Sequence, residues 1–257
     1  MGWSGIRKAA TVLAAAALAA GACTSSPRRA AVAPSPKSPG GVASATASGY
    51  RPVIDPANFV STIRNPFFPL KPGTTLVYEG VKDGDSQRDE VVVTGRTKMV
   101  LGVRCVVVED TSTHDGTLLE KTEDWYTQDA QGNVWYFGED TAEYEHGKVA
   151  STEGSWQAGV DGAQPGIVMP AHPNVTDSFR QEYYPGQAED TFWIVSLTQP
   201  VSVPYGHFDE ALLTLEFPRL EPKVIDEKEY VRGVGLVRES AAAGPKEAAE
   251  LVSVTAP

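Results

Sequence analysis

Residues 124–140, with the sequence DWYTQDAQGNVWYFGED, decide the fold class of this chain. The centre of the stretch, residues 129–133, contains Asp, Gly and Asn, which tolerate the tight or left-handed backbone of a turn. The Trp, Tyr, Val and Phe residues on either side of it favour strands. The stretch therefore predicts a β-hairpin.

The aromatic residues of this hairpin should lie on both of its faces. Side chains alternate along a strand, so Tyr126 is expected to face Tyr136 on one side and Trp125 to face Phe137 on the other. An ordinary antiparallel sheet has one face in water. We therefore expect one face of the hairpin to pack on the core and the other to be covered or to line a cavity.

Runs of β-branched and aromatic residues recur through the rest of the chain and end at Gly, Asp or Pro. They predict strands at 74–79, 90–95, 103–109, 117–128, 134–138, 141–145, 148–152, 179–184, 191–197, 201–203, 211–217, 226–231, 235–238 and 251–254. Only residues 241–250 favour a short helical turn. We expect a mainly β fold, with a single antiparallel meander sheet that forms a half-barrel or open barrel with little helix.

The first residues have the pattern of a secretory signal. Arg7 and Lys8 precede an apolar run, residues 9–20, that is too short to span a bilayer. The run ends in Leu18-Ala-Ala-Gly-Ala-Cys23, which resembles a bacterial lipobox, although Ala20 stands where Leu is usual. We expect residues 1–22 to be a signal peptide and Cys23 to be acylated. Simple cleavage after small residues remains the alternative.

Residues 23–50 are rich in Ser, Pro, Ala and Gly and predict a disordered tether. Residues 51–257 then form a single β-rich domain. The whole chain has a formal charge of −11, and all of its acidic residues follow the tether, so the domain is strongly acidic. This charge argues against nucleic acid as a partner. We expect an exported protein anchored to the outer face of the cytoplasmic membrane through its N-terminal lipid.

Carboxylate doublets at 123–124, 139–140 and 189–190 suggest acid/base chemistry, but neighbours on a strand point to opposite faces. An enzyme would need one carboxyl group from each of two strands, and the candidates are Asp124, Glu182 and Glu189. The four His residues show no metal-ligand spacing, and we expect no metal and no cofactor. Cys105 lies in a strand-like run and is interpreted as a buried core residue.

Residues 154–173 predict a long Gly- and Pro-rich loop, of the kind that often covers a site. Aromatic and apolar side chains near it could line a cavity. The candidate ligand-binding residues are Trp125, Tyr126, Trp135, Tyr136, Trp156, Met169, Tyr183 and Tyr184. A plain β-core is the alternative interpretation of the same residues.

The motifs NPFFPLKPGT (65–74), DWYTQD with GNVWYFGE (124–139), GSW (154–156), MP (169–170) and QEYY (181–184) resemble those of a bacterial, often actinobacterial, family of exported lipoproteins. That family has no established activity, so the resemblance implies location and not mechanism. The expected architecture is also loosely similar to the half-barrel lipoproteins of the LolA and LppX type.

Three classes of function follow from these expectations. The first is a membrane-anchored extracytoplasmic lipoprotein that binds an apolar or lipid-like ligand in a cavity lined by the sheet. The second is a cell-envelope hydrolase or carbohydrate-active enzyme that uses paired carboxylates, although the absence of a catalytic motif argues against an enzyme. The third is a protein-interaction module of the cell envelope, whose protein partner the sequence leaves open.

Overall fold

The computed structural model describes residues 49–82 and 84–257. These residues form a compact unit made almost entirely of β-strands. The predicted signal peptide, the lipidation site Cys23 and nearly all of the predicted tether lie outside the described residues. Among the described residues, no helix is long and apolar enough to cross a membrane.

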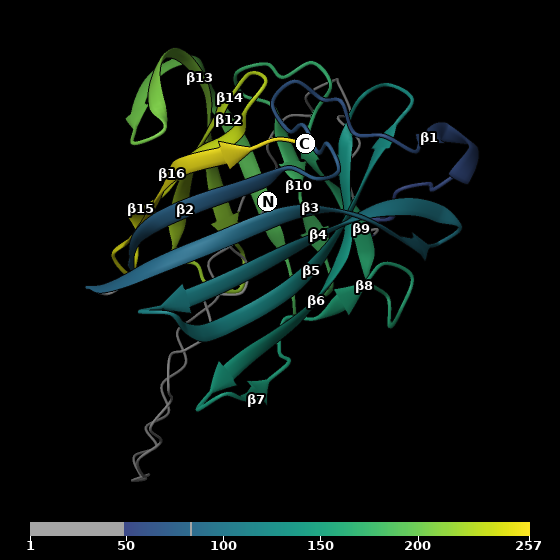
Figure 1. Cartoon of the computed structure of the whole chain (residues 1–257). Helices are drawn as coiled ribbons and strands as arrows, with labels where there is room; N and C mark the ends of the chain where they lie inside the picture. Colours follow the sequence, from purple (N-terminus) through teal and green to yellow (C-terminus); the bar gives the residue numbers. More distant parts are fainter. Residues whose placement is uncertain (1–48, 83) are drawn as a thin grey trace, which may run out of the picture. The chain divides into compact units, whose positions relative to one another are not determined.

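The described strands form one antiparallel sheet (Figure 1). The elements are η2 (Pro56–Asn58), β1 (Phe59–Val60), β2 (Thr75–Lys82), β3 (Asp85–Val100), β4 (Val103–His114), β5 (Thr117–Asp129), β6 (Val134–Glu145), β7 (Lys148–Ser151), β8 (Trp156–Gln157), β9 (Gln164–Met169), β10 (Ser178–Arg180), β11 (Glu182–Tyr183), β12 (Asp190–Val203), β13 (Gly206–Pro218), β14 (Ile225–Val231), β15 (Gly235–Ala243) and β16 (Glu247–Thr255). Their order is β10-β12-β13-β14-β15-β16-β2-β3-β4-β5-β6-β9-β11, with β1 on β5 and both β7 and β8 on β6. Most neighbours in the sheet are therefore joined by hairpins, which confirms the predicted meander.

The two ends of this order are joined by the chain itself. Strand β10 pairs with β12, and β11 pairs with β9, while only Gln181 separates β10 from β11. The Gln181 amide donates a hydrogen bond to the Asp190 carbonyl at 2.9 Å. The sheet is consequently a nearly closed, barrel-like structure, in agreement with the predicted open barrel.

The hairpin of β5 and β6 has the predicted turn. The Asp129 amide donates to the Asn133 carbonyl at 3.0 Å, and Gly132 has a φ of +99°. Tyr126 lies directly opposite Tyr136, as expected. A β-bulge follows, because Asp124 pairs with Glu139. It leaves Trp125 opposite residues 137 and 138 instead of Phe137 alone.

Two predictions about local structure are wrong. Residues 241–250 form no helical turn, because β15 continues to Ala243 and β16 begins at Glu247 after a turn at Gly244 (φ +113°). Residues 154–173 are not a free loop, because β8 and β9 lie within them and both pair with β6. The predicted lid is therefore in large part an extension of the sheet.

Candidate functional site

A proline-rich segment enters one end of the barrel and is held there by a polar side chain. The Asn65 Nδ2 atom donates hydrogen bonds to the carbonyls of Gly132 and Pro170, both at 3.0 Å. The Gln128 Oε1 atom accepts from the amides of Arg64 and Asn65 at 2.7 and 2.9 Å. Asn65 thus joins this segment to the β5–β6 turn and to the chain after β9.

The residues that follow fill the barrel interior at this end. The Phe68 ring lies 5.3 Å from Tyr126 and 6.4 Å from Tyr230, which come from β5 and β14. Tyr126 is in turn stacked on Tyr136 at 4.8 Å. All four rings are buried. We call residues 63–70 the plug, because they close this end with tightly packed apolar side chains.

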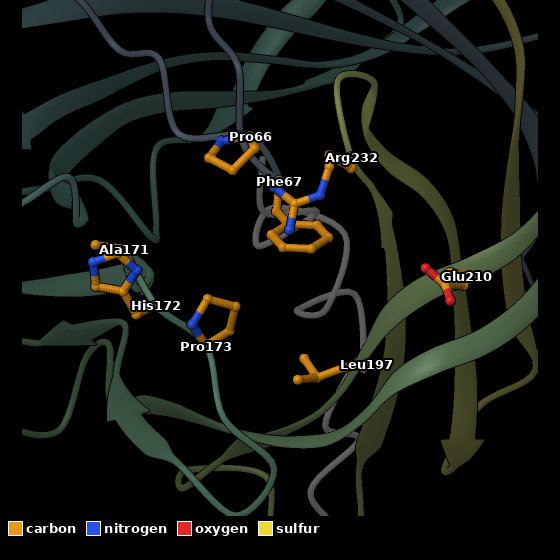
Figure 2. Close-up of a pocket in the computed structure, with 8 residues that line it drawn as sticks. All are labelled: Pro66, Phe67, Ala171, His172, Pro173, Leu197, Glu210 and Arg232. Atoms are coloured by element: carbon orange, nitrogen blue, oxygen red, sulfur yellow. The ribbon is translucent and has the colours of Figure 1, made fainter.

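A pocket of about 590 Å³ lies beside the plug. Its lining is formed by Pro66, Phe67, Ala171, His172, Pro173, Leu197, Glu210 and Arg232. Figure 2 shows the Arg232 side chain against the Phe67 ring, and the guanidinium lies 4.6 Å from the ring centre. Glu210 lies on the β13 side of the pocket (Figure 2). The pocket therefore combines apolar walls with one exposed cation and one exposed carboxylate.

The aromatic residues predicted to bind a ligand lie on both faces of the sheet. Tyr126, Tyr136 and Trp156 share the inner face, and Trp156 meets Tyr136 edge-on at 5.4 Å. Trp125 points the other way, where the Lys98 ammonium lies 3.2 Å from the ring centre. These side chains are buried by protein and do not converge on a single cavity.

The other predicted ligand-binding residues have structural contacts of their own. The Trp135 Nε1 atom donates to the Asp129 carboxylate at 2.8 Å, and Met169 is fully buried. Tyr183 packs at 5.7 Å on Tyr50, while Tyr184 lies in the connection after β11 and pairs with Ala188.

The carboxylates proposed for catalysis are split between two places. Asp124 accepts a hydrogen bond from the Tyr136 hydroxyl at 2.6 Å. Burial raises the pKa of Asp124 to about 6. Burial raises the pKa of Tyr136, and the charges of Asp124 and, to a smaller extent, Glu182 raise it further. Glu182, which is itself buried, therefore lies near the same tyrosine. Glu189 lies elsewhere and accepts from Arg219 at 3.0 Å.

More acidic residues line the interior near Asp124. The register places Asp89, Asp110, Glu120 and Asp124 on the same face of β3, β4 and β5, and we call these four residues the acidic lining. Burial raises the pKa of Asp89 and of Glu120 to about 7, and it raises the pKa of Asp110 well above its usual value. Asp89, Asp110 and Glu120 were not among the residues predicted from the sequence. The alternation Gln87-Arg-Asp89-Glu-Val91 was the available signal.

A buried ion-pair network lies on the strands across the barrel. The Lys228 ammonium is 2.7 Å from the Glu216 carboxylate and 3.7 Å from that of Glu239. The Gln181 side chain donates to Glu216 at 2.9 Å. Buried charges are stable only when they are paired and hydrogen-bonded in this way. Lys228 therefore compensates the acids beside it, and its charge also lowers the pKa of Asp124 on β5.

Reactive side chains also lie at Cys105 and in the trio Ser202, His207 and Asp209. Cys105 is buried, and burial raises the pKa of its thiol to about 12, as expected of an unreactive core residue. The Ser202 hydroxyl lies 2.6 Å from His207 Nδ1, and His207 Nε2 lies 3.5 Å from Asp209. This trio resembles a hydrolytic arrangement, but the side chains of His207 and Asp209 are 65% and 95% exposed and solvent screens them.

In the described part of the chain, no group of three or more His, Cys, Asp or Glu side chains is arranged to hold a metal ion. The four carboxyl groups of the acidic lining thus share one face of the sheet but are not arranged as the ligands of a metal ion.

Comparisons with solved structures find two similar chains. One, from Bacteroides fragilis, is provisionally named an exported protein with a YmcC-like fold; it is 16% identical, with a TM-score of 0.46, over 75% of this chain and 100% of its own. The other, from Parabacteroides distasonis, is provisionally named a lipoprotein; it is 14% identical, with a TM-score of 0.40, over 74% of this chain and 99% of its own. No family model and no curated protein matches the sequence.

Proposed function

We propose that this chain is an extracytoplasmic lipoprotein, anchored through Cys23, whose domain binds an amphiphilic ligand in the pocket beside the plug. The signal-like residues 1–22 and the lipobox-like end of that run support export and anchoring. The pocket supports ligand binding. Catalysis is not part of this proposal, because the candidate carboxylates are not brought together: Asp124 accepts from Tyr136, whereas Glu189 pairs with Arg219 elsewhere.

The pocket itself is the observation that carries this proposal. Its volume of about 590 Å³ lies within the range of small-molecule sites, which is about 300–1,000 Å³. Phe67, Leu197 and Pro173 supply apolar walls for a hydrocarbon body. The Arg232 guanidinium is held over Phe67 and keeps donors available for a carboxylate or phosphate group.

Binding of a fluorescent fatty acid, 11-(dansylamino)undecanoic acid, to the purified protein tests this proposal. We expect saturable binding and a blue-shifted dansyl emission. Arg232→Ala should weaken binding by about tenfold or more, because a hydrogen bond to a charged group contributes about 1.5–3 kcal/mol. Arg104→Ala removes the same charge from an exposed position on β4 and serves as the control. Equal affinity of the two variants, or no saturable binding by the parent protein, would exclude this pocket as the site.

Native mass spectrometry of protein purified without detergent supplies a second test. We expect an adduct with the mass of an apolar or lipid-like molecule on a fraction of the folded chain. The adduct should decrease in Arg232→Ala and persist in Arg104→Ala. A homogeneous protein without an adduct, which also takes up no added fatty acid, would count against ligand binding.

A further inference from the structure

The acidic lining belongs to one continuous inner surface of the barrel. Asp89 lies opposite Tyr78 on β2 and opposite Ser112 on β4, and Ser112 lies opposite Glu120 on β5. Residues that are directly opposite share a face of the sheet. Because Tyr78 is fully buried, this row faces the barrel interior.

The next two rows carry the other members of the lining. Asp110 lies between Val91 and Thr122, and Asp124 lies opposite Val108. Beyond Asp124 comes Tyr126, which contacts the plug. The interior therefore changes along the strands from apolar and packed at the plug to acidic further away.

Neutral groups are the hydrogen-bond donors that the structure places on the lining. Gln87 Nε2 lies 3.4 Å from Asp89 Oδ1 and 2.5 Å from the Ser112 hydroxyl, and the Thr122 hydroxyl donates to Glu120 at 3.0 Å. Neutral donors reduce the cost of burying a carboxylate but do not cancel its charge. In the described part of the chain, no ammonium group is paired with Asp89 or Asp110 as Lys228 is with Glu216 and Glu239, although Lys228 lowers the pKa of Asp124.

Charged groups at the rim leave this imbalance in place. Lys82 lowers the pKa of Glu120, but it is the smallest of the causes that act on that group, and Glu143 acts in the opposite direction. Glu247 on β16 likewise opposes ionisation of Asp89. The described groups at the rim therefore add one lysine, Lys82 on β2, and two acids, Glu143 on β6 and Glu247 on β16.

Among the residues that the structure describes, two carboxylate oxygens of the lining are buried without a hydrogen-bond partner. Asp89 is 1% exposed, and its Oδ2 atom has no partner. The Oδ1 atom of Asp110 is in the same situation, although the rest of that residue is partly accessible. Glu120 is also partly accessible. The lining thus presents buried acceptors that lack donors, together with polar groups that solvent can reach.

We propose that the acidic lining is a second binding site, separate from the pocket beside the plug, and that it takes an organic cation with primary or secondary ammonium groups. An ammonium group supplies both the missing positive charge and N–H donors for Asp89 Oδ2 and Asp110 Oδ1. A linear polyamine fits the arrangement, because the carboxylates are spread over adjacent strands. A metal ion fits less well, since the described acids do not converge into a coordination group.

Binding should be linked to proton release. The pKa values of Asp89 and Glu120 are raised by burial to about 7, so both carboxyl groups are partly protonated near neutral pH. A cation placed against them favours their ionised forms and lowers both pKa values. Protons therefore leave the protein when the cation binds at pH 7.

Calorimetric titration of the purified full-length protein with spermidine tests the site. The titration is performed at pH 7.0 in phosphate and in Tris, whose ionisation enthalpies differ, so that the number of released protons can be measured. Asp89→Asn should weaken binding by about tenfold or more and reduce proton release. Glu90→Gln removes one charge from the adjacent, outward-facing residue of β3 and should change neither quantity.

The control separates a specific site from general attraction to an acidic protein. Equal weakening in Asp89→Asn and Glu90→Gln would show that spermidine follows net charge only and would overturn the proposal. So would the absence of saturable binding at millimolar spermidine, or binding without proton release. Loss of the native fold does not confound the result, because Asp89→Asn removes a buried charge and should stabilise the domain at this pH.

Discussion

The acidic lining should make the domain less stable as the pH rises, and Asp89→Asn should remove a large part of this effect. Burial raises the pKa of Asp89 from 3.8 to about 7. A carboxyl group with a raised pKa holds its proton in the folded state at pH values where the unfolded chain has released it. Its stabilising contribution is therefore complete below about pH 4 and is lost as the pH rises to about 7.

The size of the effect follows from the shift. A difference of about three pKa units at about 1.36 kcal/mol each corresponds to about 4 kcal/mol. This is an upper value for Asp89 alone, because Glu120 titrates over the same range and interacts with it. At pH 8 we expect Asp89→Asn to exceed the parent protein in free energy of unfolding by about 2–4 kcal/mol. At pH 4 the two proteins should agree within about 1 kcal/mol.

Urea denaturation followed by tryptophan fluorescence from pH 4 to pH 8.5 measures this difference directly. The difference between variant and parent is the informative quantity, because all other carboxylates titrate in both proteins. Glu90→Gln provides the matched control, with one charge removed on the outer side of the same strand. A difference that is independent of pH, or an Asp89→Asn protein less stable than its parent at pH 8, would refute the buried and uncompensated state of Asp89.

Four further substitutions, one of them a control, test the interactions that hold the barrel together around both sites. Asn65→Ala removes the hydrogen bonds that hold the plug, so the backbone groups that Asn65 now satisfies lose their partner. It should lower the free energy of unfolding by about 3 kcal/mol in urea denaturation. Gly166→Ala places a Cβ atom 2.2 Å from a backbone carbonyl where the barrel closes, and it should lower the melting temperature by several degrees. Gly95→Ala has no atom within 4 Å of its Cβ and should leave the melting temperature nearly unchanged in the same calorimetric scan. Lys228→Met leaves two buried carboxylates without their cation and should lower the free energy of unfolding by about 3–5 kcal/mol in urea denaturation.

Local turn chemistry explains why the sheet could be predicted from the sequence. The residues between β5 and β6 require a tight turn, and the aromatic flanks require burial, so the hairpin follows without knowledge of the rest of the chain. The separation of the carboxylate doublets was predictable from the alternation of side chains along a strand. Asp124 is buried while its neighbour Glu123 points outward to Arg96 at 2.8 Å.

The failures lie where distant pairing overrides local preference. Residues 241–250 are rich in Ala and Glu, which favour helix, but hydrogen bonding of β16 to β2 decides their conformation. Residues 154–173 contain many Gly and Pro residues, yet the exposed edge of β6 recruits β8 and β9. The acidic lining likewise depends on pairing between segments that are distant in the sequence. Alternation puts Asp89 and Val91 on one face, but only closure of the barrel shows that this face is the interior.

The two proposed sites lie in different parts of the barrel, and this division has a physical cause. The plug end is already filled, because Phe68 and the stacked tyrosines occupy the interior, so a ligand there is displaced to the pocket beside Arg232. At Asp89 the interior instead carries charge that weakens the fold at neutral pH. Apolar residues of similar volume would stabilise such a position by about 1–4 kcal/mol. An ammonium ligand reverses that penalty by supplying the missing charge, and mass action then adds its binding free energy to the stability of the folded barrel.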